Sequence, residues 1–349
     1  LQVVEGFIDQ VTVEGDIRHG KSILQRLGDR IKASVPLKAS DLERYMLLAN
    51  DLPGIRAQAV LQPSSQQGAT ALTILVTEDP VAVFASVNNR GSKFNGPVQM
   101  QVAADFNSIL GAFSKTGIRL VGTSQLSEFK SAELNHKVLL GTEGTAVTIV
   151  GRHTRSRPGG SLAELDIDSK STSGSLTVSY PIIRTRKKSL YVHAGLDIRN
   201  TETTILEQPF TKDRVRKAVA GASFDFVDSL NGINLVTVEL SKGLDILGGK
   251  KTGAPGMSRA DAESDFFKVN MSVMRLQKIV PRVSLLVDVT GQYTDDALVA
   301  SEEIAIGGSQ YGRAFDPSEI NGERGIAGRA ELRYDGRSTA KWLKQYQIY

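Results

Sequence analysis

The sequence predicts a mainly β protein, in which a small α+β domain precedes a transmembrane antiparallel β-barrel. Three observations predict this fold. Residues 1–78 mix helical and strand periodicities, whereas residues 79–349 form a run of segments that alternate apolar and polar side chains. These segments are about ten residues long, the length of a tilted strand that crosses a bilayer. Long and short connections also alternate along the second region.

The composition argues against an enzyme, a metalloprotein and a nucleic-acid binder. The 349 residues include no cysteine and four histidines, and no two histidines have metal-ligand spacing. The net charge of +4 is spread along the chain, whereas nucleic-acid binders concentrate basic residues on one element. No nucleotide-binding motif or nucleophile frame is recognisable. We therefore expect no cofactor, no metal, no nucleic acid and no small-molecule substrate.

The first domain begins with an alternating strand over residues 7–15, followed by a helix with apolar positions Ile23, Leu24, Leu27 and Ile31. A second helix starts after Pro36, and strands follow at 55–61 and 71–76. This order fits a three-stranded sheet with two helices on one face, whose exposed edge can accept an extended peptide. The order and the phrase Val11-Thr12-Val13-Glu14-Gly15 resemble a POTRA (polypeptide-transport-associated) domain.

The second region shows strict alternation in segment after segment. Between residues 190 and 198, for example, every second side chain is apolar, namely Leu190, Val192, Ala194, Leu196 and Ile198. Because successive side chains on a strand point to opposite faces, each segment has one apolar and one polar side. We predict thirteen strands, starting near residues 81, 97, 117, 129, 144, 171, 188, 213, 232, 265, 282, 326 and 342.

The connections supply an orientation. Long loops are predicted after odd-numbered strands, at 156–170, 201–212, 246–264 and 296–325, and mostly short turns after even-numbered strands. Outer-membrane barrels have short periplasmic turns and longer extracellular loops. A chain that enters from a periplasmic domain places its odd-strand loops outside, in agreement with this parity. No segment approaches the roughly 20 apolar residues of a membrane-spanning helix, and no signal peptide opens the chain, so we expect a mature or trimmed fragment.

The longest loop, 296–325, carries a motif. It contains a glycine pair, an arginine with an aromatic two residues later, and an acidic residue between glycines: Gly307, Gly308, Arg313, Phe315, Asp316, Gly322, Glu323 and Gly325. The motif precedes a strand that contains Glu331-Leu332. This constellation resembles the signature of two-partner secretion transporters, the haemolysin- and haemagglutinin-exporting barrels related to BAM-type insertases. The sequence departs from that signature at Ala314, where the family usually has glycine, and at Glu323, where aspartate is usual.

The resemblance implies a role for the loop and further parts of the protein. In the family the loop folds into the lumen, and its arginine, here Arg313, meets an acidic residue on the inner wall. A guanidinium suits this role because it stays charged and grips a carboxylate with two hydrogen bonds. The family's usual acidic partner would fall just past Tyr349, and Glu331 and Asp288 are secondary candidates. Sixteen strands are implied, about thirteen of them present, with an earlier POTRA domain and a plug helix outside this chain.

The expected function is therefore export of an unfolded partner polypeptide through the lumen, with outer-membrane lipid and lipopolysaccharide around a monomeric barrel. A BAM-type insertase shares the domain plan and remains an alternative. A passive porin does not explain the first domain. His193 and Asp197 share one polar strand face and are interpreted as channel lining. The basic group Arg152, His153, Arg155 and Arg157 is interpreted as a solvated outer rim near lipopolysaccharide.

Overall fold

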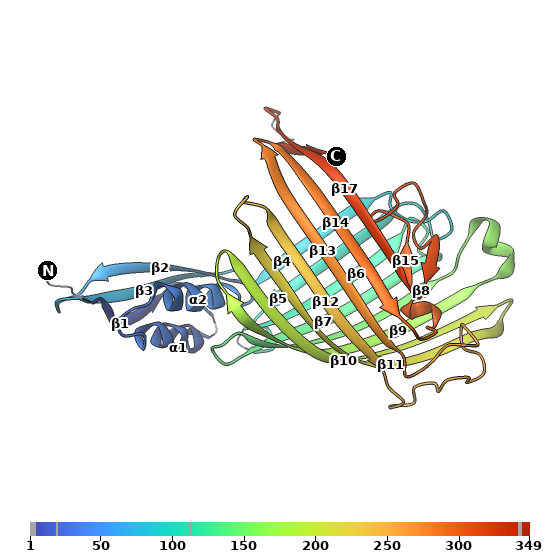
Figure 1. Ribbon diagram of the computed structural model, residues 1–349, viewed down its shortest axis with the longest axis horizontal. Helices are drawn as coiled ribbons and strands as arrows, with labels where there is room; N and C mark the ends of the chain where they lie inside the picture. Colours follow the sequence, from blue (N-terminus) through green and yellow to red (C-terminus); the bar gives the residue numbers. More distant parts are fainter. Residues whose placement is uncertain (1–4, 19, 112, 341–343) are drawn as a thin grey trace.

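The computed structural model describes residues 5–18, 20–111, 113–340 and 344–349, and contains a three-stranded sheet, a thirteen-stranded sheet and a short two-stranded hairpin (Figure 1). The two larger sheets meet at Asp79-Pro80, between the strands that end at Glu78 and begin at Val81. The division into domains at 1–78 and 79–349 stays our proposal.

The small sheet and its two helices follow the predicted order. The elements are β1 (Phe7–Glu14), α1 (Lys21–Lys32), α2 (Ala39–Asn50), β2 (Ile55–Pro63) and β3 (Ala69–Glu78). The strand order is β1-β3-β2, with β1 parallel and β2 antiparallel to β3. The apolar faces of the helices pack on the sheet, and the core includes Ile8, Leu24, Ile31, Leu72 and Ile74. The helical and strand periodicities thus predicted these elements correctly.

The large sheet is antiparallel throughout, and its strands neighbour one another in chain order. Its strands are β4 (Val81–Asn88), β5 (Gln99–Asn107), β6 (Ser114–Thr123), β7 (Phe129–Leu140), β8 (Thr145–Ser156), β9 (Asp168–Arg184), β10 (Lys188–Ile205), β11 (Gln208–Val227), β12 (Ile233–Gly243), β13 (Phe267–Val280), β14 (Val283–Thr294), β17 (Gly325–Arg337) and β18 (Gln345–Ile348). All thirteen predicted strands are present. The start predicted near Trp342 lies outside the described residues.

One predicted loop is wrong. Residues 201–212 continue the β10–β11 hairpin, which closes in a two-residue turn at Leu206 and Glu207, both with positive φ. Threonines and an ion pair between the directly opposed Glu202 and Lys212 extend the ladder, since β-branched residues and opposite charges favour cross-strand pairing. At 18 and 20 residues, β10 and β11 are far longer than a bilayer requires.

The two faces of the large sheet differ in polarity. Exposed apolar side chains cover the convex face, among them Val102, Leu120, Leu176, Leu196, Met271 and Val273. The opposite face carries polar and charged side chains, several of them buried, such as Lys268, Asp288, Gln292 and Glu331. A β-sandwich would instead bury the apolar faces against each other. The outward apolar and inward polar pattern is that of an outer-membrane barrel wall.

The sheet curls around its polar face. β4 and β18 are its two edges, yet Arg90, just after β4, donates through Nη2 to the Tyr349 hydroxyl at 3.0 Å. The connections after β4, β6, β8, β10, β12 and β14, which are the odd-numbered strands in the count from residue 81, lie at the end remote from the small sheet (Figure 1). The turns at 141–144 and 185–187 contact the small sheet's helices. No described helix combines the length and apolarity needed to cross a bilayer.

Candidate functional site

The loop between β14 and β17 turns back inside the curled sheet. It contains a 3-10 turn, η2 (Ala300–Glu302), and a small hairpin of β15 (Ile304–Ile306) and β16 (Ile320–Gly322). The glycine pair starts the tip: Gly307 and Gly308 both have positive φ, and a Cβ on Gly307 would lie 2.2 Å from the Asp316 carbonyl oxygen. The left-handed position inside the tip belongs to Gly312 rather than to Ala314. Alanine is therefore accommodated at the position where the sequence departs from the motif.

The tip contacts an acidic residue on the inner wall. Arg313 donates through Nη2 to the carboxylate of Glu331, in the middle of β17, and its guanidinium lies 4.8 Å from the centre of the Tyr349 ring. Two arginines of the same strand also bind Glu331: Arg329 at 3.2 Å and Arg333 at 2.7 Å. Three guanidinium groups thus surround one buried carboxylate.

Asp288, the other candidate wall residue, is linked to Arg313 only indirectly. Arg329 donates to both acids, at 3.1 Å to Asp288 on β14 and at 3.2 Å to Glu331. Arg329 therefore bridges the two carboxylates and links Asp288 to the acid that Arg313 binds. Among the described residues, Glu331 is the acid that meets Arg313 directly.

The remaining motif residues occupy the base and rim of the loop. Asp316 lies 3.4 Å from Lys93 Nζ, in the connection after β4, and Phe315 is 58% exposed. Glu323 binds Arg259 Nη1 at 2.8 Å, while Gly322 ends β16 and Gly325 begins β17. Glu323 therefore links the base of the loop to the outer connection 244–266.

A second group of contacts, which the sequence reasoning missed, holds the stem of the loop. Glu302 is 3% exposed and lies 2.9 Å from Lys217 Nζ on β11 and 2.7 Å from Lys268 Nζ on β13. Arg199 on β10 lies 3.7 Å away. Alternation places the three cations on a polar strand face, but nothing in the sequence indicates which loop carboxylate they meet.

The outer connections pack on the stem. Arg259 binds Glu303 at 2.7 Å as well as Glu323. The hydrogen bonds to Glu303 and Asp261, together with the charge of Glu323, raise the pKa of Arg259 above its ordinary value. Beneath it lies a small apolar cluster: Val215, Ala262, Phe266, Leu298 and Val299. This cluster joins connection 244–266 to the start of the lumen loop, so the two loops form one unit at the outer end.

The small sheet is fixed to the other end of the barrel. Arg184, at the end of β9, donates to both carboxylate oxygens of Asp51 at 2.8 and 2.6 Å. Tyr45 on α2 donates to Glu143 at 3.2 Å, and burial together with the Glu143 charge raises the pKa of Tyr45. Phe113, from the turn before β6, is buried in the small sheet's core cluster. Three barrel regions thus contact the small domain.

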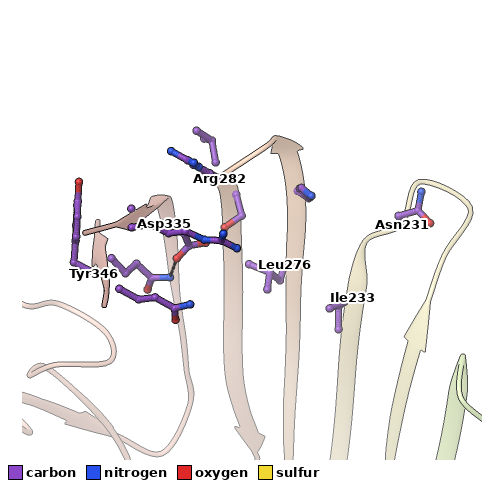
Figure 2. A pocket seen from close by; sticks show the side chains of 13 residues that line it. Asn231, Ile233, Leu276, Arg282, Asp335 and Tyr346 are labelled. Atoms are coloured by element: carbon purple, nitrogen blue, oxygen red, sulfur yellow. Dashed lines mark hydrogen bonds between the residues drawn. The ribbon is translucent and has the colours of Figure 1, made fainter. Parts of the chain in front are cut away.

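Figure 2 shows the side chains that line a cavity of about 950 Å³ at the strand ends opposite the lumen-loop connection. It lies along the ends of β13, β14, β17 and β18, and its lining includes Asn231, Ile233, Leu276, Arg282, Asp335 and Tyr346. Lys278 and Arg337 add further positive charge to the rim. The cavity is wide, its lining is mixed polar and apolar, and it lies away from the lumen loop.

The other predicted positions are occupied by contacts within the chain. His193 faces Glu239 at 3.6 Å, and Asp197 lies 3.9 Å from Lys217. Of the rim residues, Arg155 and Arg157 bind Asp168 at 2.6 and 3.1 Å. Within the described residues, no group of histidine and acidic side chains has a metal-binding arrangement.

An apolar outer face, a charged inner face and a loop held inside define this protein as an outer-membrane β-barrel with an internal loop. The family of haemolysin secretion/activation proteins ShlB/FhaC/HecB matches residues 68–349, and the chain belongs to that family. The predicted resemblance to two-partner secretion transporters is confirmed.

Individual relatives are distant. The heme/hemopexin transporter protein HuxB of Haemophilus influenzae strain 86-028NP is 21% identical over 342 residues, 96% of this chain and 60% of the relative. The chain thus spans about 60% of the length of the curated relatives it matches.

Solved structures support the fold. CdiB from Escherichia coli aligns with a TM-score of 0.82 at 19% identity, covering 97% of this chain and 63% of CdiB. BamA from Haemophilus ducreyi, lacking POTRA domains 1–3, aligns with a TM-score of 0.53 at 12% identity, covering 97% and 69%. At these identities the likeness concerns the fold alone.

Proposed function

We propose that this chain is the transport region of an outer-membrane protein that exports an unfolded partner polypeptide through its lumen. The observation that carries the proposal is the loop 295–324, which is held inside the barrel through the charged residues Arg313 and Glu302. Charged contacts can be exchanged for water or for polar groups of a passing chain, whereas a permanent core is closed by apolar packing. Family membership and the relative's name, a transporter, support this function.

The small domain is proposed to lie in the periplasm and to capture the partner. β2 is an edge strand, with β3 on one side and no strand on the other among the described residues. Gln58, Ala59 and Leu61 are exposed along it. An extended segment of the partner can add to this edge through main-chain hydrogen bonds, which require no particular sequence. Its attachment through Arg184 and Asp51 would hold the captured segment at the periplasmic end of the barrel.

In this proposal the barrel stands in the membrane as a monomer. The apolar strand faces contact lipid. The connections remote from the small domain lie outside the cell, with the rim residues Arg152, Arg155 and Arg157 at the level of lipopolysaccharide. The captured chain enters the lumen at the end that carries the small domain, displaces the loop and moves outward. No nucleotide is required, because folding of the partner outside opposes its return.

The test is removal of the full-length protein from its own bacterium, with surface delivery of its partner followed by immunoblotting. The expected result is loss of the partner from the surface while the other outer-membrane barrels keep their normal amounts. A general loss of barrels would contradict the proposal and favour a BAM-type insertase. Normal partner delivery would exclude both.

A further inference from the structure

Three cations on the lumen wall converge on one carboxylate of the loop. Lys217 and Lys268 reach Glu302 with Nζ–Oε2 distances of 2.9 and 2.7 Å, and Arg199 Nη1 lies 3.7 Å from Oε1. The side chain of Lys268 is 7% exposed and that of Glu302 is 2% exposed. Isolated buried ammonium groups are costly, so these lysines require an anion nearby.

The cations come from the barrel, but the main carboxylate does not. Arg199, Lys217 and Lys268 stand on β10, β11 and β13, which are fixed by their ladders, whereas Glu302 belongs to η2 of the loop. The other acid in contact is Asp197, 3.9 Å from Lys217. The three cations and two carboxylates together carry one net positive charge. When Glu302 leaves, the remaining four groups carry two.

There is room for another side chain beside these groups. A cavity of about 160 Å³ lies beside them, and its lining includes the charged residues Arg152, Asp197, Arg199, Lys217 and Glu302 and the small residues Ser173, Gly174 and Ser175. The cavity borders Arg199 and Lys217 directly, so a second carboxylate could approach these two cations before Glu302 has moved away.

We propose that Arg199, Lys217 and Lys268 form a carboxylate-binding site on the lumen wall. Glu302 occupies the site at rest, and acidic side chains of the chain in transit take its place. The exchange swaps one ion-paired carboxylate for another and never leaves the lysines unpaired. It therefore lowers the barrier to withdrawing the stem of the loop, a step separate from release of Arg313 at the tip. The identity of the ligand rests on the proposed export function.

The site can be tested without secretion, by recording single-channel currents of the full-length protein in planar lipid bilayers. The probe is a hexaglutamate peptide, with hexaglutamine as the neutral control. Glu302→Gln frees the site while keeping the side-chain shape. Hexaglutamate should therefore block this variant at a roughly tenfold lower concentration than the wild type, the change supported by one charge-assisted hydrogen bond. Hexaglutamine should block neither.

Removing the cations should reverse the effect. In Glu302→Gln/Lys217→Met/Lys268→Met, hexaglutamate block should weaken by roughly tenfold or more. The matched control replaces Lys212, a lysine of the projecting hairpin, by methionine in Glu302→Gln, and it should keep the strong block. Folding of each variant is checked by heat-modifiable gel mobility, and Glu302→Gln/Lys217→Met replaces the triple variant if that one does not fold.

Equal block of Glu302→Gln and the cation-depleted variant would overturn the site, and equal block of wild type and Glu302→Gln would overturn its occupation by Glu302. The proposed function fails separately. If secretion is normal but the peptide does not block the channel, only the proposed carboxylate site is contradicted. If the peptide blocks the channel but the protein secretes nothing, only the proposed export function is contradicted.

Discussion

Release of the loop tip offers the sharpest prediction. Arg313→Ala removes one of three guanidinium groups around Glu331 but leaves Arg329 and Arg333 bound to it at 3.2 and 2.7 Å. The carboxylate therefore stays paired. The closed loop loses less free energy than the roughly 3–5 kcal/mol that an unpaired buried charge costs. A hydrogen bond between charged groups contributes about 1.5–3 kcal/mol, and the 45% exposure of the Arg313 side chain argues for the lower end.

A loss of about 1.5 kcal/mol corresponds to roughly a tenfold rise in the ratio of open to closed loop. The assay is single-channel recording of the full-length protein in planar bilayers, where the ratio follows from open and closed dwell times. Arg324→Ala is the control, since this arginine of the same loop is exposed and contacts Asp295 at 3.4 Å and the centre of the Tyr293 ring at 5.4 Å, away from Glu331. An unchanged ratio in Arg313→Ala, equal to that of Arg324→Ala, would refute the reasoning, as would normal gating combined with normal secretion.

Three further predictions concern other parts of the protein. Arg184→Ala should weaken attachment of the small domain by about 1–2 kcal/mol, because it removes a bidentate pair with Asp51, and hydrogen exchange in α2 should then accelerate, whereas Arg186→Ala should leave it unchanged. Arg259→Met should free the outer loops from Glu303 and Glu323, and proteolysis within 244–266 should speed up roughly tenfold; the same rate as in Lys251→Met would contradict this. Val273→Arg, on the lipid face, should cost about 2–4 kcal/mol and reduce the assembled fraction on gels, while Ser272→Arg, toward the lumen, should assemble; equal assembly of both would exclude the assigned faces.

Local sequence pattern accounted for most of the fold. Every strand of the large sheet was predictable because alternation with period two is a property of each segment alone. The error at 201–212 arose where that signal fades. Thr201, Thr203 and Thr204 suit a strand yet mark no apolar face, and the tight turn uses Leu206 and Glu207 in a conformation that such side chains rarely adopt.

The internal site was predictable only in part. The motif located the loop and Arg313, and it included Glu331 as a candidate partner. Glu302 could not be predicted, because its contacts with Lys217 and Lys268 join residues 85 and 34 positions apart. Such contacts depend on how far the loop descends into the barrel, which no local pattern encodes. Arg259 was missed for the same reason, since it links two separate outer loops.

The central claim, passage of a polypeptide through the lumen, can be tested by site-specific crosslinking, because the chain contains no native cysteine. Asn270 and Met271 are neighbours on β13: Asn270 binds Gln292 at 2.8 Å on the inner face, and Met271 is 48% exposed on the outer face. A partner carrying one cysteine is stalled in transit by a folded domain at its C-terminus. The account predicts a disulfide with Asn270→Cys and none with Met271→Cys. Crosslinks to Met271→Cys alone, or to neither, would contradict it.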